Sequence, residues 1–256
     1  MAEITLLKRG PIGEIRLNRP AVLNAMGRDW PVAMQSAITE INADHEIRVV
    51  LLTAEGRSFC SGVDLTQLAA GEIQPRWFHD NEIVLRAIET MDKPVIAGIQ
   101  GYCIGGGLQI AIACDVRLAA DDAIFGLPAA KEAFLPGMST WRLARLIGMG
   151  HAKHLILSGQ NIDPQEAHRM GLVNFVVPRE SLERELEAMA TRYLGVPAPS
   201  LKWAKRLTDQ SLDLPFERFL DEFDRAIRIV LASDEHRVAM RAWRERKSRM
   251  TPDEGS

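Results

Sequence analysis

The N-terminal segment shows the alternation of apolar and polar side chains that is typical of half-buried strands. The alternation occurs in residues 4–8 and again in residues 12–17, and Gly10 and Pro11 lie between the two runs. Two alternating runs joined by such a turn signal predict a β-hairpin.

Farther along the chain, short aliphatic runs alternate with segments of helical periodicity. The runs that predict strands are residues 49–53, 94–99 and 116–119. The segments that predict helices are residues 29–41, 81–89 and 107–114. Strands that alternate with helices of this length indicate an α/β fold with right-handed crossovers.

From Gly148 onward the pattern is mainly helical. A segment rich in Gly and Pro at 195–199 indicates a linker. We therefore expect a core region over residues 1–195 and a separate helical region over residues 196–256. Helices are predicted for residues 152–157, 164–170, 182–193, 200–210, 215–231 and 236–246, and a strand is predicted for residues 173–177.

The predicted helix at 215–231 carries a marked apolar face. A short three-helix region could hardly bury this face by itself, so it packs either on another subunit or on the core of its own chain. The apolar residues that share the face are Phe216, Phe219, Leu220, Phe223 and Ile227.

The composition excludes several classes of protein. A chain of 256 residues with 46% hydrophobic content can form a large core, and a net charge of −3 gives no sign of nucleic-acid binding. We expect no secretory signal and no membrane span, since no apolar run approaches the ~20 residues that cross a bilayer. Three cysteines fit a reducing cytoplasm better than a disulfide framework, and no spacing predicts a metal site.

A glycine-rich turn follows the predicted strand at 94–99. Gly105, Gly106 and Gly107 lead into an apolar helix, so free backbone N–H groups face out of the turn at the positive end of that helix. Such a turn can bind negative charge, and its glycines leave the backbone accessible. Alternatively, the glycines only let the helix pack closely on a strand.

A second turn has the letters SGVDL at 61–65 and follows the strand at 49–53. Together with the letters GYCIGGG at 101–107, it resembles the enoyl-CoA hydratase/isomerase (crotonase) superfamily, in which two such turns face each other. The resemblance extends over residues 4–250. It implies the crotonase (ClpP/crotonase) spiral of ββα units, a C-terminal helical trimerisation region, and a homotrimer or hexamer that acts on acyl-CoA in fatty acid metabolism.

The resemblance also implies where the thioester would bind. The backbone N–H groups of Val63 and Gly106 would donate to the thioester oxygen, and each such donor is typically worth ~2.7–4 kcal/mol in a transition state. Coenzyme A would be part of the substrate, so no separate cofactor is implied. The other residues implied at these two turns are Ser61, Gly62, Asp64, Leu65, Tyr102 and Gly105, of which Asp64 is expected to brace its turn.

Two further segments match the parts of the family that contact CoA. Residues 18–26, with the letters NRPAVLNAM, would place Ala21, Val22 and Leu23 along the CoA channel, or would form an ordinary strand-to-helix loop. Near the C-terminus, Trp243 and Arg246 would stack on adenine and pair with a phosphate. The alternative for that helix is a solvated basic face.

The residues of the reaction itself depart from the family pattern. Its hydratases use two glutamates, and the matching positions here hold Gln109 and Ala129. An amide exchanges no proton near neutral pH and alanine has no polar group, so we do not expect standard hydration. Positioned acid–base groups usually contribute about 10²–10⁴-fold in rate.

A relocated carboxylate is one way to restore proton transfer. Glu132 is the first candidate, and the segment with His79, Asp80 and Glu82 is the second. Each also has an ordinary explanation, because Glu132 adjoins Lys131 in a surface turn and the other segment resembles a polar helix start.

Three interpretations therefore remain open. The protein is an enzyme whose chemistry needs the oxyanion donors but not the two glutamates, such as a decarboxylase or thioesterase. Alternatively, it binds acyl-CoA without turnover, or it is a hydratase or isomerase with a relocated acid–base group and Gln109 orienting water. The two intact donor turns favour an enzyme.

Overall fold

The computed structural model describes the backbone of residues 3–250 and the side chains of residues 3–247. The chain forms two compact units, of which the first extends to Tyr193 and the second begins at Leu194. The first unit holds both glycine turns, so it is described first.

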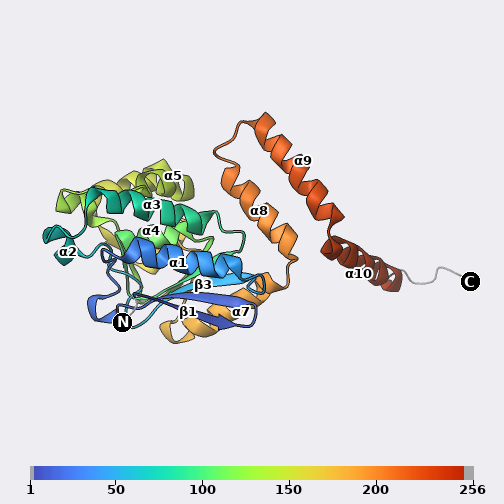
Figure 1. The fold of residues 1–256 in the computed structure, drawn as a ribbon, viewed down its shortest axis with the longest axis horizontal. Helices are drawn as coiled ribbons and strands as arrows, with labels where there is room; N and C mark the ends of the chain where they lie inside the picture. Colours follow the sequence, from blue (N-terminus) through green and yellow to red (C-terminus); the bar gives the residue numbers. More distant parts are fainter. Residues whose placement is uncertain (1–2, 251–256) are drawn as a thin grey trace, which may run out of the picture. The chain divides into compact units, whose positions relative to one another are not determined.

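A six-stranded sheet forms the centre of the first unit (Figure 1). The first two strands pair antiparallel as a hairpin, which confirms the sequence prediction, and the remaining neighbours are parallel. In sheet order the strands are β1 (Ile4–Arg9), β2 (Ile12–Leu17), β3 (Val49–Ala54), β4 (Val95–Ile99), β6 (Val116–Ala120) and β9 (Phe175–Val177).

A smaller sheet lies next to the glycine turns and consists of three short strands. Its members, in sheet order, are β5 (Tyr102–Ile104), β7 (Ile124–Gly126) and β8 (Asn161–Ile162). Its first strand is part of the segment that the sequence analysis treated as a turn. The mixed sheets and helices form the α/β fold that the sequence predicted.

Helices cover both faces of the larger sheet (Figure 1). On the far face, the side chain of Leu186 lies so close to Gly98 of the sheet that no Cβ would fit there. The α-helices of this unit are α1 (Trp30–Ala43), α2 (Leu65–Ala69), α3 (Pro75–Glu89), α4 (Gly106–Ala113), α5 (Ser139–Ser158), α6 (Pro164–Arg169) and α7 (Leu182–Leu194), where α7 covers that far face. The 3₁₀ turns are η1 (Pro20–Val22), η2 (Pro128–Glu132) and η3 (Arg179–Ser181).

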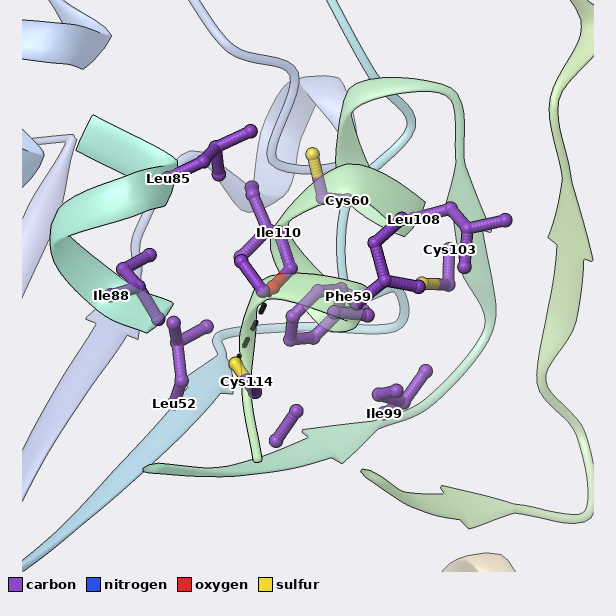
Figure 2. Close-up of a cluster of buried hydrophobic side chains, with 14 of the residues drawn as sticks. Leu52, Phe59, Cys60, Leu85, Ile88, Ile99, Cys103, Leu108, Ile110 and Cys114 are labelled. Atoms are coloured by element: carbon purple, nitrogen blue, oxygen red, sulfur yellow. Dashed lines mark hydrogen bonds between the residues drawn. The ribbon is translucent and has the colours of Figure 1, made fainter. Parts of the chain in front are cut away.

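Helix α4 is buried on all sides, and Figure 2 shows the apolar side chains that surround it. Side chains from α3, including Leu85 and Ile88, contribute to the same cluster. The helix has no polar face because it carries only glycine, alanine and aliphatic residues besides one glutamine. Its burial fixes the position of the glycine turn at its N-terminus.

The structure corrects two helix starts. Helix α3 begins at Pro75 rather than at residue 81, and α5 begins at Ser139, well before the predicted helical segment. Gly148 has φ 78° and ψ 157°, which interrupts the helical backbone and hid the first half of α5 from the periodicity. Within the described residues, no helix is both long and apolar enough to cross a bilayer.

The second unit consists of α8 (Ala198–Gln210), α9 (Phe216–Ala232) and α10 (Asp234–Met250). Trp203 on α8 and Ala226 on α9 are buried, and the Arg225 guanidinium on α9 lies 6.0 Å from the centroid of the Trp203 ring. Much of the predicted apolar face of α9 is exposed in the single chain, including Phe216 and Phe223. Its coverage by another subunit stays a prediction.

Candidate active site

Backbone hydrogen bonds join the two predicted turns side by side. The N–H of Cys60 donates to the carbonyl of Tyr102 at 2.8 Å, and the N–H of Ile104 donates to the carbonyl of Cys60 at 3.0 Å. Residues far apart in the sequence are therefore paired like neighbouring strands. This pairing places Gly62 directly against the start of α4.

Close backbone approach explains the glycines at this junction. Gly62 has φ +102°, and a Cβ on it would lie 3.0 Å from the carbonyl oxygen of Ile104 and 3.3 Å from the nitrogen of Gly106. A Cβ on Gly107 would lie 2.2 Å from the carbonyl oxygen of Cys60. Only residues without a side chain allow the two turns to approach this closely.

Two backbone donors remain available at the junction. Among the described residues, the N–H groups of Val63 and Gly106 donate to no protein acceptor. Met26 holds the first turn on both sides of Val63, because its N–H donates to Gly62 and its carbonyl accepts from Asp64. Gly106 is the first residue of α4, where N–H groups lack a helical partner and the helix dipole is positive. The arrangement can stabilise an oxyanion.

Gln109 lies one helical turn beyond Gly106 and is buried. Its Oε1 has no hydrogen-bond partner in the described part of the chain, and it lies 2.7 Å from the position that a Cβ on Gly137 would take. Oε1 of Glu82 lies 2.6 Å from the same position. An amide from α4 and a carboxylate from α3 therefore meet at Gly137.

The carboxylate of Glu82 is held in place from two directions. The N–H of Met138 donates to its Oε1 at 2.8 Å, and the buried guanidinium of Arg142 pairs with its Oε2. Arg142 also pairs with Glu89, which lies seven residues after Glu82 on the same face of α3. The one signal for this ion network in the sequence is the seven-residue spacing of the two glutamates, which places them on one face of a helix.

We expect Arg142→Ala to lower the free energy of unfolding by about 3 kcal/mol, because it leaves Glu82 without its cation, while Glu89 keeps only Arg86. Urea denaturation measures this loss. Arg145→Ala serves as the control, since Arg145 is exposed and stacks 3.8 Å from the centroid of the Trp141 ring. A loss below 1 kcal/mol for both variants, about the value of an exposed pair, would show that the network contributes little.

An apolar cavity of about 750 Å³ adjoins this group of side chains. The rings of Phe78 and Phe134 form part of its wall, with centroids 5.1 Å apart. Gly137 belongs both to the cavity wall and to the meeting point of Glu82 and Gln109. The other lining residues are Leu68, Ile73, Pro75, Ala130, Ala133 and Leu135. A cavity of this size with an apolar lining can hold a short hydrocarbon chain.

The remaining acid–base candidates lie in different surroundings. Ala129 is partly buried in η2, whereas Glu132 is exposed at the end of that turn. His79 is exposed and Asp80 is partly exposed on α3, and the His79 Nδ1 lies 3.3 Å from the Asp80 carboxylate. Among the described residues, no three His, Cys, Asp or Glu side chains are grouped as a metal site requires.

The cysteines beside the two turns are poor nucleophiles. Complete burial raises the pKa of the Cys60 thiol to about 12, and burial also raises the pKa of the Cys103 thiol well above its usual value. The reactive thiolate is therefore scarce at neutral pH. Both thiols fill space in the core (Figure 2).

The residues expected along a CoA channel form the edge of the first turn. Ala21 and Val22 are exposed, and Leu23 takes a left-handed backbone with φ 54°. Asp64 caps α2, because its Oδ1 accepts the N–H groups of Thr66 and Gln67 at 3.2 Å each.

Five more of the predicted binding residues are exposed or partly exposed. Ser61 is partly buried, and Leu65 and Tyr102 are exposed beside the two turns. Trp243 and Arg246 belong to the second unit and are exposed on α10. Lys247 Nζ lies 5.2 Å from the centroid of the Trp243 ring. Binding of the nucleotide end of CoA by Trp243 and Arg246 stays a prediction.

Comparison with known proteins gives consistent matches over nearly the whole chain. Residues 8–250 match the family model for enoyl-CoA hydratase/isomerase. The chain is 34% identical to a short-chain-enoyl-CoA hydratase of Clostridium acetobutylicum and 32% identical to a crotonyl-CoA hydratase of Syntrophomonas wolfei, in each case over 95% of both chains. The crystal structure of an enoyl-CoA hydratase from Bacillus anthracis superposes with a TM-score of 0.91 at 32% identity, covering 95% of this chain and 96% of that one.

Proposed function

Because this chain belongs to the enoyl-CoA hydratase/isomerase family, we propose that it binds an acyl-CoA thioester and stabilises an enolate at the thioester oxygen. The observation that carries the proposal is the pair of available N–H groups, Val63 and Gly106, on two turns in direct backbone contact. Donors fixed in advance of the reaction stabilise developing charge without reorganisation.

The acyl chain would occupy the apolar cavity next to Gly137. In that position the thioester carbonyl points to the N-terminus of α4, and CoA runs along the exposed loop that carries Val22. Coenzyme A is part of the substrate, so the proposal includes no separate cofactor. We also propose a cytoplasmic protein whose α9 face, with Phe216 and Phe223, is covered by other copies in a trimer or hexamer.

The two-glutamate form of hydration is not part of this proposal. Gln109 stands where one glutamate is expected and Ala129 where the other is expected, so neither position can transfer a proton. The reaction must therefore obtain its proton transfer from another group or require none.

Binding is tested by calorimetry with crotonyl-CoA, with CoA alone as the comparison ligand. We expect crotonyl-CoA to bind more tightly than CoA. Leu135 lines the cavity and is 78% exposed in the free chain, so the bound acyl chain would cover it, and Leu135→Asp should weaken crotonyl-CoA binding about tenfold. Leu157→Asp is the matched control, because Leu157 is 73% exposed on α5 and does not line the cavity. If crotonyl-CoA does not bind to the wild type, the proposed function is wrong.

A further inference from the structure

If the protein acts on an acyl-CoA thioester as proposed, its proton-transfer group must lie outside positions 109 and 129. We propose that Glu82 is the acid–base carboxylate of this active site, and that Gln109 orients the water on which it acts. Glu82 comes from α3, whereas both family positions discussed above come from α4 and η2.

The first support is the position of Glu82. Its Oε1 and the Oε1 of Gln109 lie 2.6 and 2.7 Å from the same point beside Gly137. Gly137 lines the apolar cavity, and Gln109 is one helical turn from the Gly106 donor. The carboxylate is therefore placed where the acyl cavity meets the oxyanion donors.

The second support is the contrast with the other carboxylates of the region. The side chain of Glu82 is only 16% exposed, whereas that of Asp80 is 42% exposed and paired with Arg76. Glu132 is also exposed. A proton-transfer group has to reach the reacting atoms directly or through one water. Of these candidates, Glu82 is the one whose carboxylate lies beside Gln109 and the cavity residue Gly137.

The third support is the rigid mounting of Glu82. Met138 and Arg142 each hold one of its oxygens. The adjacent residue, Asn81, is buried and accepts the Trp30 indole N–H at 3.0 Å, which ties this part of α3 to α1. A carboxylate fixed on a helix by such partners keeps a constant orientation, as a catalytic group requires.

The fourth support is the unpartnered oxygen of Gln109. A buried amide oxygen normally accepts a hydrogen bond. Among the described residues, no group donates a hydrogen bond to the Oε1 of Gln109. A reacting water between Gln109 and Glu82 would donate one O–H to the amide and the other to the carboxylate. In this arrangement Gln109 orients the water by accepting a hydrogen bond, which requires no proton transfer by the amide.

The chemistry balances with one carboxylate and one water. Glu82 takes a proton from the water while the water oxygen bonds to C3 of a 2-enoyl thioester. The C2–C3 π electrons shift through the conjugated system, and negative charge develops on the thioester oxygen. The N–H groups of Val63 and Gly106 hold that enolate. The enolate then collapses, C2 takes the proton back from Glu82, and the carboxylate is regenerated with water added across the double bond.

The test compares Glu82→Gln with the wild type. We expect wild type to consume crotonyl-CoA, followed by the loss of its conjugated absorbance, and Glu82→Gln to lose about 10²–10⁴-fold in kcat. Calorimetry should show that crotonyl-CoA binding is retained, because glutamine keeps the shape of the side chain. The matched control is Glu40→Gln on the exposed face of α1, which should leave kcat unchanged.

A second reaction tests the base without a double bond in the acyl chain. Exchange of the C2 protons of butyryl-CoA in D₂O, measured by mass spectrometry, needs only a base and the oxyanion donors. We expect Glu82→Gln to lose this exchange as well. Gln109→Met should reduce hydration but leave C2 exchange in place, since exchange needs no attacking water.

The outcomes separate the two proposals. Equal rates for Glu82→Gln and wild type, or loss of turnover only in Glu132→Gln, would overturn the role of Glu82. A wild type that binds crotonyl-CoA but is silent in both reactions would also overturn it, while CoA-thioester binding would stand. Failure of wild type to bind crotonyl-CoA would overturn the proposed function itself.

Discussion

Gly107→Ala is expected to remove most of the turnover and to destabilise the protein. The new Cβ would lie 2.2 Å from the carbonyl oxygen of Cys60 and 2.9 Å from its carbonyl carbon. These are backbone atoms that cannot rotate away, so α4 and the turn at 60–64 must separate. The separation displaces the Val63 N–H relative to the Gly106 N–H.

The clash should lower both the stability of the protein and its kcat. Overpacking of a core typically costs about 1–3 kcal/mol of stability. Misplacing one oxyanion donor typically costs about 10²–10³-fold in kcat. Urea denaturation and the rates of crotonyl-CoA hydration and C2 exchange measure the two effects separately.

Gly150→Ala is the matched control for this variant. Gly150 also lies in a helix, and a Cβ on it would meet no atom within 4 Å. Alanine is a better helix former by about 0.8–1.0 kcal/mol, so this variant should be slightly more stable and equally active. Full activity of Gly107→Ala would contradict the oxyanion role of the two turns.

The second large effect is a rescue. In the Glu82→Gln background, Gln109→Glu together with Ala129→Glu should raise crotonyl-CoA hydration by about 10²–10⁴-fold. The change places carboxylates at the two positions where the family resemblance implies them, next to the proposed oxyanion donors. Loss of absorbance at saturating crotonyl-CoA measures kcat.

Two comparisons show where the rescue comes from. Gln109→Glu alone should restore less, because it supplies one carboxylate rather than two. With Glu82 present, a glutamate at 109 would lie close to a second carboxylate, and like charges at such a site push one group to hold its proton. If the rescued variant binds crotonyl-CoA and remains silent, the scaffold does not support hydration, and decarboxylation or carriage of acyl-CoA become the better interpretations.

The sequence predicted most of the first unit because its strands and turns are local signals. The runs that became β3, β4 and β6 are short and aliphatic, and the hairpin has its own turn residues. It did not show α2, the three strands of the smaller sheet or the first half of α5. These segments are short or, in α5, are interrupted by the backbone of Gly148.

By itself the sequence determined the glycines of the two turns and the residues Gln109 and Ala129, which stand where the family resemblance implies glutamates. Each depends only on residue type and order along the chain. Only the tertiary structure decided that Glu82 meets Gln109, and it did so by packing α3 on α4 and bringing Gly137 against both side chains. Periodicity indicates which face of a helix is buried but not which side chain of another segment it will face.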